Sequence, residues 1–435
     1  MRQRIFLMAA VAASLALTAC GGGGSVPSPG SPTASPAPFN VVFSGTKNVQ
    51  ATYAYPAASP YPNENLTSQI NESTTITSPV SQTTYYQTTE TEALPNVTHT
   101  YTTQEEVAQT AGTGNLQNLV VGGINYSDDS KDSQQVRYSP ALIVDEQPES
   151  NGLTWSNTAA LTANEKYADG TTIARTQNAD GSYSDAMVSP DGTNATITLN
   201  SDGSGGIATP STSPALYGGA VVSYSFSAPS AAPSAGGKIT VAIDFSPAYA
   251  ASYNITPNPF LETGNAWFAP ISATNPLYSD STSVTTAAAF PASCNVPSAY
   301  GTTGNDVRRT IQSIDPILGY EEVTQTDAYV DPTVGPVCVA LQDSVLTFYD
   351  WQGTNTFGSH NFTSGQPLQI TNTTQTLTLQ SGSGAGIQGL LSLAPAAIAG
   401  AEANFNASIS AVHMKRTAQF LQYIRTLSTN GGRPQ

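Results

Sequence analysis

Four Asp-Gly pairs recur at a constant interval in the middle of the chain, and this repeat constrains the fold more than any other feature of the sequence. The pairs are Asp169-Gly170, Asp180-Gly181, Asp191-Gly192 and Asp202-Gly203, each 11 residues after the one before. Glycine after aspartate supplies the positive φ that a tight hairpin turn requires, and the Ser or Thr that follows starts the next strand. The repeat therefore predicts consecutive antiparallel strands over residues 167–206.

The segments between these turns alternate in polarity, as strands do. Before the last turn the two sets are Ala195, Ile197 and Leu199 on one face and Asn194, Thr196, Thr198 and Asn200 on the other. Successive side chains of a strand point to opposite faces, so one face of this sheet is expected to be buried and the other solvated.

Short alternating runs extend over most of the chain and predict a mainly β fold. We expect two β regions, residues 39–215 and 216–380, built as antiparallel meander sheets in a sandwich or an open barrel-like arrangement. Only 10% of the residues are charged, against about 25% in an average soluble protein. Ser, Thr, Asn and Gln must then supply most of the solvated surface, which argues against a helix-rich cytosolic protein.

The acidic turns also suggest a second interpretation, a calcium site. The candidate ligands are Asn178, Asp180, Ser182 and Asp185, or Asp128, Asp129 and Asp132. Neither run has the glycine at position 6 or the bidentate glutamate at position 12 of an EF-hand loop. Turn chemistry explains these aspartates better, and we expect no metal and no other cofactor.

The N-terminus carries the features of an export signal. Arg2 and Arg4 precede an apolar stretch over residues 5–19, which is too short to cross about 30 Å of hydrocarbon as a helix. The stretch closes on Leu17-Thr18-Ala19-Cys20, and here the chain resembles the bacterial lipoprotein signal with its lipobox. This resemblance covers the first 20 residues. It implies removal of residues 1–19, a diacylglycerol on the sulfur of Cys20, and a membrane as partner.

A spacer follows Cys20, as a lipid anchor needs. Residues 20–38 combine a Gly-Gly-Gly-Gly-Ser run with several prolines and can bury nothing, so they form the expected tether. Residue 21 is Gly and not the Asp that usually retains lipoproteins at the inner membrane. The resemblance therefore implies the outer membrane of a bacterial cell envelope.

Two cysteines remain once Cys20 is assigned to the lipid. Cys294 and Cys338 form an even number in an oxidising compartment, and no Cys-x-x-Cys motif points to redox chemistry. We expect a structural disulfide between them.

The sequence changes character at a Ser-Gly-Ser-Gly run, residues 381–384, which we expect to be a flexible break. Between residues 402 and 427 the apolar side chains fall near one helical face. Lys415, Arg416 and Arg425 lie toward the end of this segment, which suits the helix dipole. We therefore expect a C-terminal helix within residues 381–435. Its basic side chains could touch an acidic sheet surface or anionic lipid, and docking on the body is favoured.

Charge and motifs weigh against several functional classes. The formal net charge of −16 leaves no dense basic field for a nucleic acid. His99, His360 and His413 lie far apart, and neither a His-Glu-x-x-His nor a Gly-x-Ser-x-Gly motif occurs. The pairs Asp145-Glu146 and Glu321-Glu322 have the residue types of a two-carboxylate glycosidase, but neighbours on a strand point to opposite faces. An enzyme is therefore less favoured than a non-enzymatic protein.

One cluster in the second β region has the character of a binding site. Tyr349, Asp350, Trp351 and Gln352 place an aromatic surface beside a carboxylate and an amide, which suits a carbohydrate. Alternating aromatic residues also cover β cores, and that reading is favoured.

Together these features favour a membrane-anchored envelope lipoprotein that acts as a non-enzymatic structural or interaction module, with an envelope protein or a glycan as partner. One alternative is a carrier that shelters an apolar ligand in a curved sheet. Another is a surface protein that binds or hydrolyses glycans. An interaction module keeps the inner sheet face polar or closed, whereas a carrier needs a continuous apolar concavity.

Overall fold

The structure, a computed structural model, describes most of the chain between Asn40 and Ser383. The described residues are 40–53, 64–80, 83–92, 98–111, 116–127, 132–190, 192, 194–209, 221–227, 237–252, 254, 256, 259–266, 271–331, 335–347, 352–355, 358–360 and 369–383. The export signal, Cys20, the tether and residues 384–435 of the expected C-terminal helix lie outside these ranges.

Within these ranges the chain is built almost entirely from β-strands. They are β1 (Asn40–Tyr53), β2 (Glu64–Val80), β3 (Thr83–Glu92), β4 (Thr98–Ala111), β5 (Leu116–Ser127), β6 (Ser133–Gln147), β7 (Thr154–Ser156), β8 (Ala160–Lys166), β9 (Thr172–Gln177), β10 (Tyr183–Val188), β11 (Asn194–Leu199), β12 (Gly205–Ala208), β13 (Val221–Ser227), β14 (Gly237–Asp244), β15 (Phe260–Ala266), β16 (Tyr278–Ala289), β17 (Thr303–Asp315), β18 (Tyr320–Asp331), β19 (Gly335–Thr347), β20 (Gln352–Asn355), β21 (Gly358–His360) and β22 (Gln369–Ser383). Helical segments are short: α1 (Pro247–Ser252), η2 (Ala292–Cys294) and η3 (Ser298–Tyr300).

Every pairing between these strands is antiparallel, and together the pairings form one continuous ladder. Its spatial order is β7, β16–β19, β22, β1–β6, β8–β15, β20 and β21. Among the described strands β7 and β21 are its two ends, and they do not pair with each other. The expected mainly β, antiparallel fold is confirmed, and the ladder is open.

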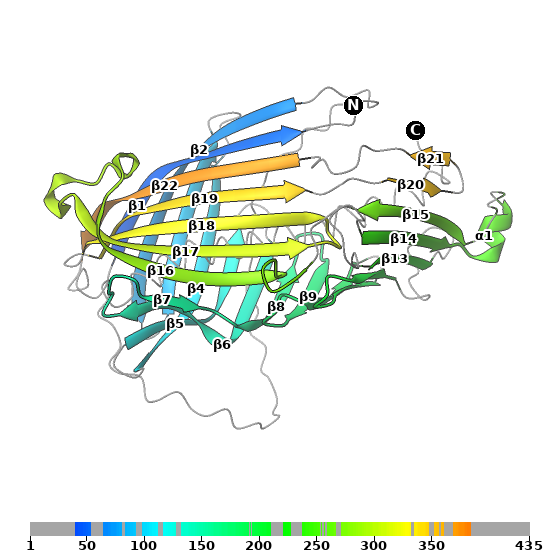
Figure 1. Ribbon diagram of the computed structural model, residues 1–435, viewed down its shortest axis with the longest axis horizontal. Helices are drawn as coiled ribbons and strands as arrows, with labels where there is room; N and C mark the ends of the chain where they lie inside the picture. The colour runs from blue at the N-terminus through cyan, green and yellow to red at the C-terminus, as the bar shows by residue number, and fades with distance from the viewer. Residues whose placement is uncertain are drawn as a thin grey trace.

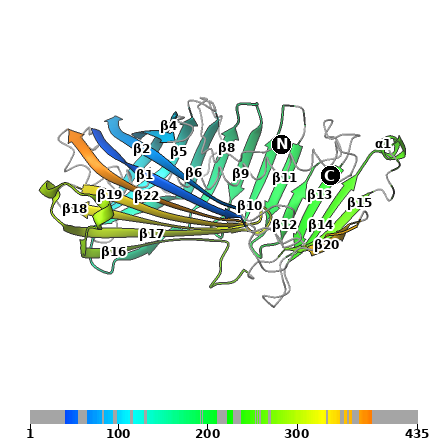
Figure 2. The same ribbon diagram turned by 90° about the horizontal axis from the view of Figure 1, so that it is seen from above.

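The ladder folds back on itself into two layers (Figures 1 and 2). The long strands β16–β19, β22, β1 and β2 form the first, which we call the long-strand layer. Strands β4–β6, β8 and β9 cross behind it in Figure 1, and β13–β15 with β20 and β21 extend beyond the ends of the long strands. The inner faces of the two layers enclose the interior of the protein.

Strands β8–β12 form the meander that the Asp-Gly repeat predicts. The glycines of all four turns have φ between 81° and 89°, and each donates its N–H to the carbonyl three residues earlier, at 2.9–3.0 Å. A backbone turn followed by a left-handed glycine is a common three-residue hairpin loop. Asp169, Asp180 and Asp202 each accept the N–H of the residue two positions later. These aspartates therefore stabilise their own turns.

Alternation along the meander also follows the sequence. Ala195, Ile197 and Leu199 are at most 2% exposed, whereas Thr196 and Thr198 are exposed. The predicted division into a buried and a solvated face is confirmed.

The main apolar core lies between the layers, near the end of the long strands where β1 begins. It joins Val41 and Phe43 of β1 to residues of β5, β6, β16–β19 and β22. Cys294 in η2 and Cys338 in β19 belong to this core and form a disulfide with their Cα atoms 5.6 Å apart. The predicted disulfide is confirmed, and it ties the segment between β16 and β17 to β19.

Two further observations concern helices. No helix in the described ranges is both long and apolar enough to span a bilayer. β22 continues to Ser383 and pairs there with Asn40, so a strand occupies the first three residues of the expected flexible break.

Candidate functional site: the charged interior

The aromatic cluster predicted as a binding site falls mostly outside the described residues. Tyr349, Asp350 and Trp351 are not among them. Gln352 begins β20, where it is paired with Asn265 of β15. The carbohydrate-binding role of this cluster stays a prediction.

The acidic pairs are buried to different extents. Asp145 is fully buried and Glu146 is 9% exposed, while Glu322 is 2% exposed; Glu321 is half-buried. The register of β5 with β6 shifts beside Asp145, so a simple alternation of faces does not hold there. Both members of the first pair are therefore buried.

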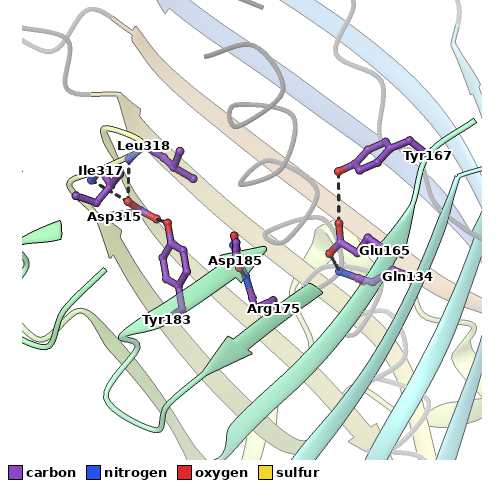
Figure 3. A network of polar contacts seen from close by, with 9 residues as sticks. All are labelled: Gln134, Glu165, Tyr167, Arg175, Tyr183, Asp185, Asp315, Ile317 and Leu318. Carbon is purple, nitrogen blue, oxygen red and sulfur yellow. Dashed lines mark hydrogen bonds and ion pairs between the residues drawn. The ribbon is translucent and has the colours of Figure 1, made fainter. Parts of the chain in front are cut away.

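A buried ion pair occupies the inner face of the meander (Figure 3). Arg175 of β9 lies directly opposite Asp185 of β10. Arg175 donates from Nε to Oδ1 at 2.8 Å and from Nη2 to Oδ2 at 2.6 Å, and the two side chains are 5% and 0% exposed. Burial lowers the pKa of Arg175, but the charge and hydrogen bonds of Asp185 outweigh this effect and raise it. The guanidinium therefore stays charged.

The same guanidinium lies over an aromatic ring. Its Cζ atom is 4.5 Å from the ring centroid of Tyr183, a geometry in which the ring attracts a cation. Arg175 is thus held by a carboxylate and an aromatic face at once.

Glu165 of β8 is a second buried acid on this face (Figure 3). Gln134 donates from Nε2 to Oε1 at 2.8 Å, and the hydroxyl of Tyr167 donates to Oε2 at 3.4 Å. Burial raises the pKa of Glu165 to about 8, although the charge of Arg175 and these hydrogen bonds oppose the shift. At neutral pH this carboxyl is mostly protonated.

A hydrogen bond joins the meander to the end of the long-strand layer. The hydroxyl of Tyr183 donates to Oδ2 of Asp315 at 2.8 Å. Oδ1 of Asp315 accepts the backbone N–H groups of Ile317 and Leu318 at 2.9 and 2.8 Å, as Figure 3 shows. Burial, followed by the charge of Asp315, raises the pKa of Tyr183 well above its ordinary value. The phenol therefore remains a donor.

A third cluster bridges β6 and β7, which do not pair through their backbones. The side chain of Asn157 accepts the N–H of Ile143 at 2.8 Å and donates to its carbonyl at 3.1 Å. It also donates to Asp280 at 2.9 Å. Asp280 in turn accepts two hydrogen bonds from Arg309, at 2.8 and 2.7 Å. Trp155 of β7 also donates from Nε1 to the carbonyl of Ile143, at 3.1 Å. Side chains thus join β6 to β7 where no backbone ladder does.

A pair of acids lies within the long-strand layer. Asp343 of β19 is hydrogen-bonded to Thr324 at 3.1 Å and to Glu322. Burial raises the pKa of Asp343 to about 6, against these hydrogen bonds and the charge of Lys47. The inner face of this layer therefore carries acids as well as apolar side chains such as Leu341 and Val345.

Asp128 and Asp129, which were considered for calcium, lie outside the described residues, and the other candidate aspartates form hydrogen bonds or ion pairs within the protein. Asp185 pairs with Arg175, Asp180 accepts from both the backbone and the hydroxyl of Ser182, and Asp132 accepts the N–H of Ala168. In the part of the chain that the structure describes, no group of three or more His, Cys, Asp or Glu could hold a metal ion.

Comparison with known proteins identifies no relative: no protein-family model and no curated protein matches this sequence.

The sequence did not lead us to predict the buried charged residues, although the spacing of one pair indicated their contact. Arg175 and Asp185 each lie five residues from Asp180, so a hairpin centred on that turn must place them opposite each other. Gln134 with Glu165, and Tyr183 with Asp315, are 31 and 132 residues apart, and no local pattern pairs them. Chemically, this interior holds the charges of Arg175 and Asp185 as a fixed pair beside buried apolar side chains such as Ile173 and Met187.

Proposed function

We propose that the protein is a lipid-anchored lipoprotein of the bacterial cell envelope that acts as a non-enzymatic interaction module. The lipobox at Cys20 and the tether over residues 20–38 support the anchorage. The β body then stands away from the membrane surface and meets an envelope protein or a glycan there.

One observation carries the choice of an interaction module over an apolar carrier. The inner face of the meander, where a carrier would need a continuous apolar surface, holds the Arg175–Asp185 ion pair and Glu165. An apolar ligand on this face would have to lie against these polar groups, and it could not hydrogen-bond to them. Binding at the outer surface fits this interior better.

The test uses the full-length protein recovered from its own membranes. We expect extraction with organic solvent to release no apolar molecule in stoichiometric amount, and chemical crosslinking in intact cells to yield one reproducible adduct with a protein or a glycan. One apolar molecule per chain would instead favour the carrier, and release of sugar from a glycan library would favour an enzyme. Either result would contradict the proposal.

A further inference from the structure

The solvated face of strands β8–β14, which we call the outer face, carries very little charge. These strands follow one another in a single sheet, as Figure 2 shows. Among the described side chains on this face, three are charged: Lys166 of β8, and Lys238 and Asp244 of β14. The acids of the hairpin turns, such as Asp169 and Asp202, lie beyond the strand ends. A chain with a formal net charge of −16 thus has one broad face that is almost neutral.

The residues of the outer face are small and aligned from strand to strand. One row crosses all seven strands in register, and its members are Thr162, Thr176, Ser184, Thr198, Gly206, Ser225 and Thr240. The next row consists of Asn164, Ala174, Ala186, Thr196, Ala208, Ser223 and Ala242. Side chains of similar small size make an even surface, on which a second sheet can pack face to face.

Exposed apolar side chains also gather on this side of the sheet. Four large apolar residues are exposed in the described structure, and two of them, Val188 of β10 and Leu261 of β15, lie here. Leu261 is paired with Ala242 of β14, so it continues the second row on the neighbouring strand. Covering both side chains would remove apolar surface from water and favour association.

The outer face is large enough for a stable interface. Strands β9, β10 and β11 have six residues each. Seven such strands cover about 34 by 20 Å, or about 700 Å². Two facing copies would bury about 1,400 Å² in total, within the range of roughly 1,200–2,000 Å² for specific interfaces. The acidic remainder of the chain repels a second copy, so this neutral face is where two copies can meet.

We infer that the outer face is the interface between two copies of this chain, related by a two-fold axis along β11. β11 is the middle strand of the seven, so the rotation places β8 of one copy over β14 of the other and keeps each row over itself. Lys166 and Asp244 each lie two residues beyond the second row, on the same side. Each Lys166 therefore lies over Asp244 of the partner subunit, and opposite charges meet at the rim.

The oligomeric state of the full-length chain in solution tests this inference, which goes beyond the proposed envelope partner. Cys20→Ala is included in every sample, so no lipid can hold two copies together. Sedimentation equilibrium should detect dimers. Thr196→Arg places two guanidinium groups on the two-fold axis and should raise the dissociation constant at least about tenfold. The matched control Gln342→Arg, at an exposed position of β19, should change it less than about twofold.

Two outcomes of this experiment would overturn the inference. One is a chain that stays monomeric at about 100 μM. The other is an equal change of the dissociation constant in the two arginine variants.

Crosslinking locates the interface independently. With Cys20 replaced, the Cys294–Cys338 disulfide leaves no other thiol in the chain, so Thr196→Cys introduces a single one. A short bismaleimide should join two copies through this thiol, and Gln342→Cys should give far less covalent dimer. Equal yields would contradict the interface. A monomeric chain whose Thr196→Cys thiol is protected by an insoluble glycan would assign the face to the glycan instead and overturn the inference.

Charge exchange tests the orientation of the two copies. Lys166→Asp and Asp244→Lys should each raise the dissociation constant about threefold or more, because each substitution places like charges together at both ends of the interface. The double variant restores opposite charges and should return to within about twofold of the starting value. Losses that simply add in the double variant would contradict the two-fold axis along β11.

Discussion

At the scale of single residues, the interior is defined by charged groups that are buried and paired. The Arg175–Asp185 pair is almost completely shielded from water, whereas the Arg137–Glu106 pair, with side chains 55% and 49% exposed, lies at the surface. Removing one partner of a buried pair leaves the other charge without compensation. Exposed pairs contribute little because water screens them.

These two pairs make a matched comparison. Asp185→Asn should lower the free energy of unfolding by about 3–5 kcal/mol, while Glu106→Gln should lower it by less than about 1 kcal/mol. Replacing both partners, Arg175→Met with Asp185→Leu, should recover part of the loss because no buried charge remains. Denaturant titration measures all three variants. Similar losses in the two single variants would show that the inner pair is not shielded.

Glu165 predicts a pH dependence of stability. Its pKa is about 8 in the folded protein, raised from an ordinary value of 4.5. Between these values the folded state binds more protons than the unfolded state, so the free energy of unfolding falls as the pH rises from 4.5 through 8. Glu165→Gln should flatten this slope by up to about 1.4 kcal/mol per pH unit. If the free energy of unfolding depends on pH in the same way in wild type and variant, the raised pKa of Glu165 is refuted.

At the scale of elements, the Asp-Gly turns both shape the meander and contact its neighbours. Gly181 has φ +89°, and a Cβ atom added there would lie 2.7 Å from Cβ of Tyr278 in β16. Gly152 has a similar φ of +81° but no atom within 4 Å of such a Cβ. Substitutions at these two glycines therefore distinguish the cost of backbone strain from the cost of a contact with a neighbouring strand.

Alanine at these two positions should therefore have unequal effects. Gly152→Ala should cost about 1–2 kcal/mol, the strain of a left-handed residue with a side chain. Gly181→Ala should cost clearly more, since Tyr278 must also move. Thermal unfolding of both variants gives the comparison. Equal costs would mean that the second turn does not press against β16.

The strands also show how much of the fold could be predicted from the sequence. Turns and alternation are local properties, so the strands between Tyr167 and Gly206 and their buried face could be predicted from Asp-Gly spacing alone. The order of the remaining strands depends on distant pairings, such as β1 with β22 and β7 with β16, which no local pattern encodes. Most contacts among the buried charged residues could not be predicted for the same reason. Asp280 and Asn157, for example, are hydrogen-bonded although 123 residues separate them in the sequence.

At the scale of the whole molecule, one covalent link joins distant parts of the ladder. Cys294 and Cys338 are separated by 44 positions and fully buried. The chain-entropy model gives such a link about 4 kcal/mol of stabilisation. Cys294→Ser with Cys338→Ser should lose a comparable amount in denaturant titration. Thiol labelling of the folded, unreduced wild type should modify neither residue, and labelling of both would contradict the disulfide.

Anchorage through Cys20 is the central claim about the molecule, and its most direct test is the distribution of wild type and Cys20→Ala between membrane and soluble fractions, with palmitate labelling of both. Several acyl chains hold a protein on a bilayer far more firmly than one. The wild type should therefore sediment with membranes and carry the label, whereas Cys20→Ala should be unlabelled and soluble. Membrane association of the variant equal to that of the wild type, with no label on either protein, would contradict a lipid-anchored envelope protein.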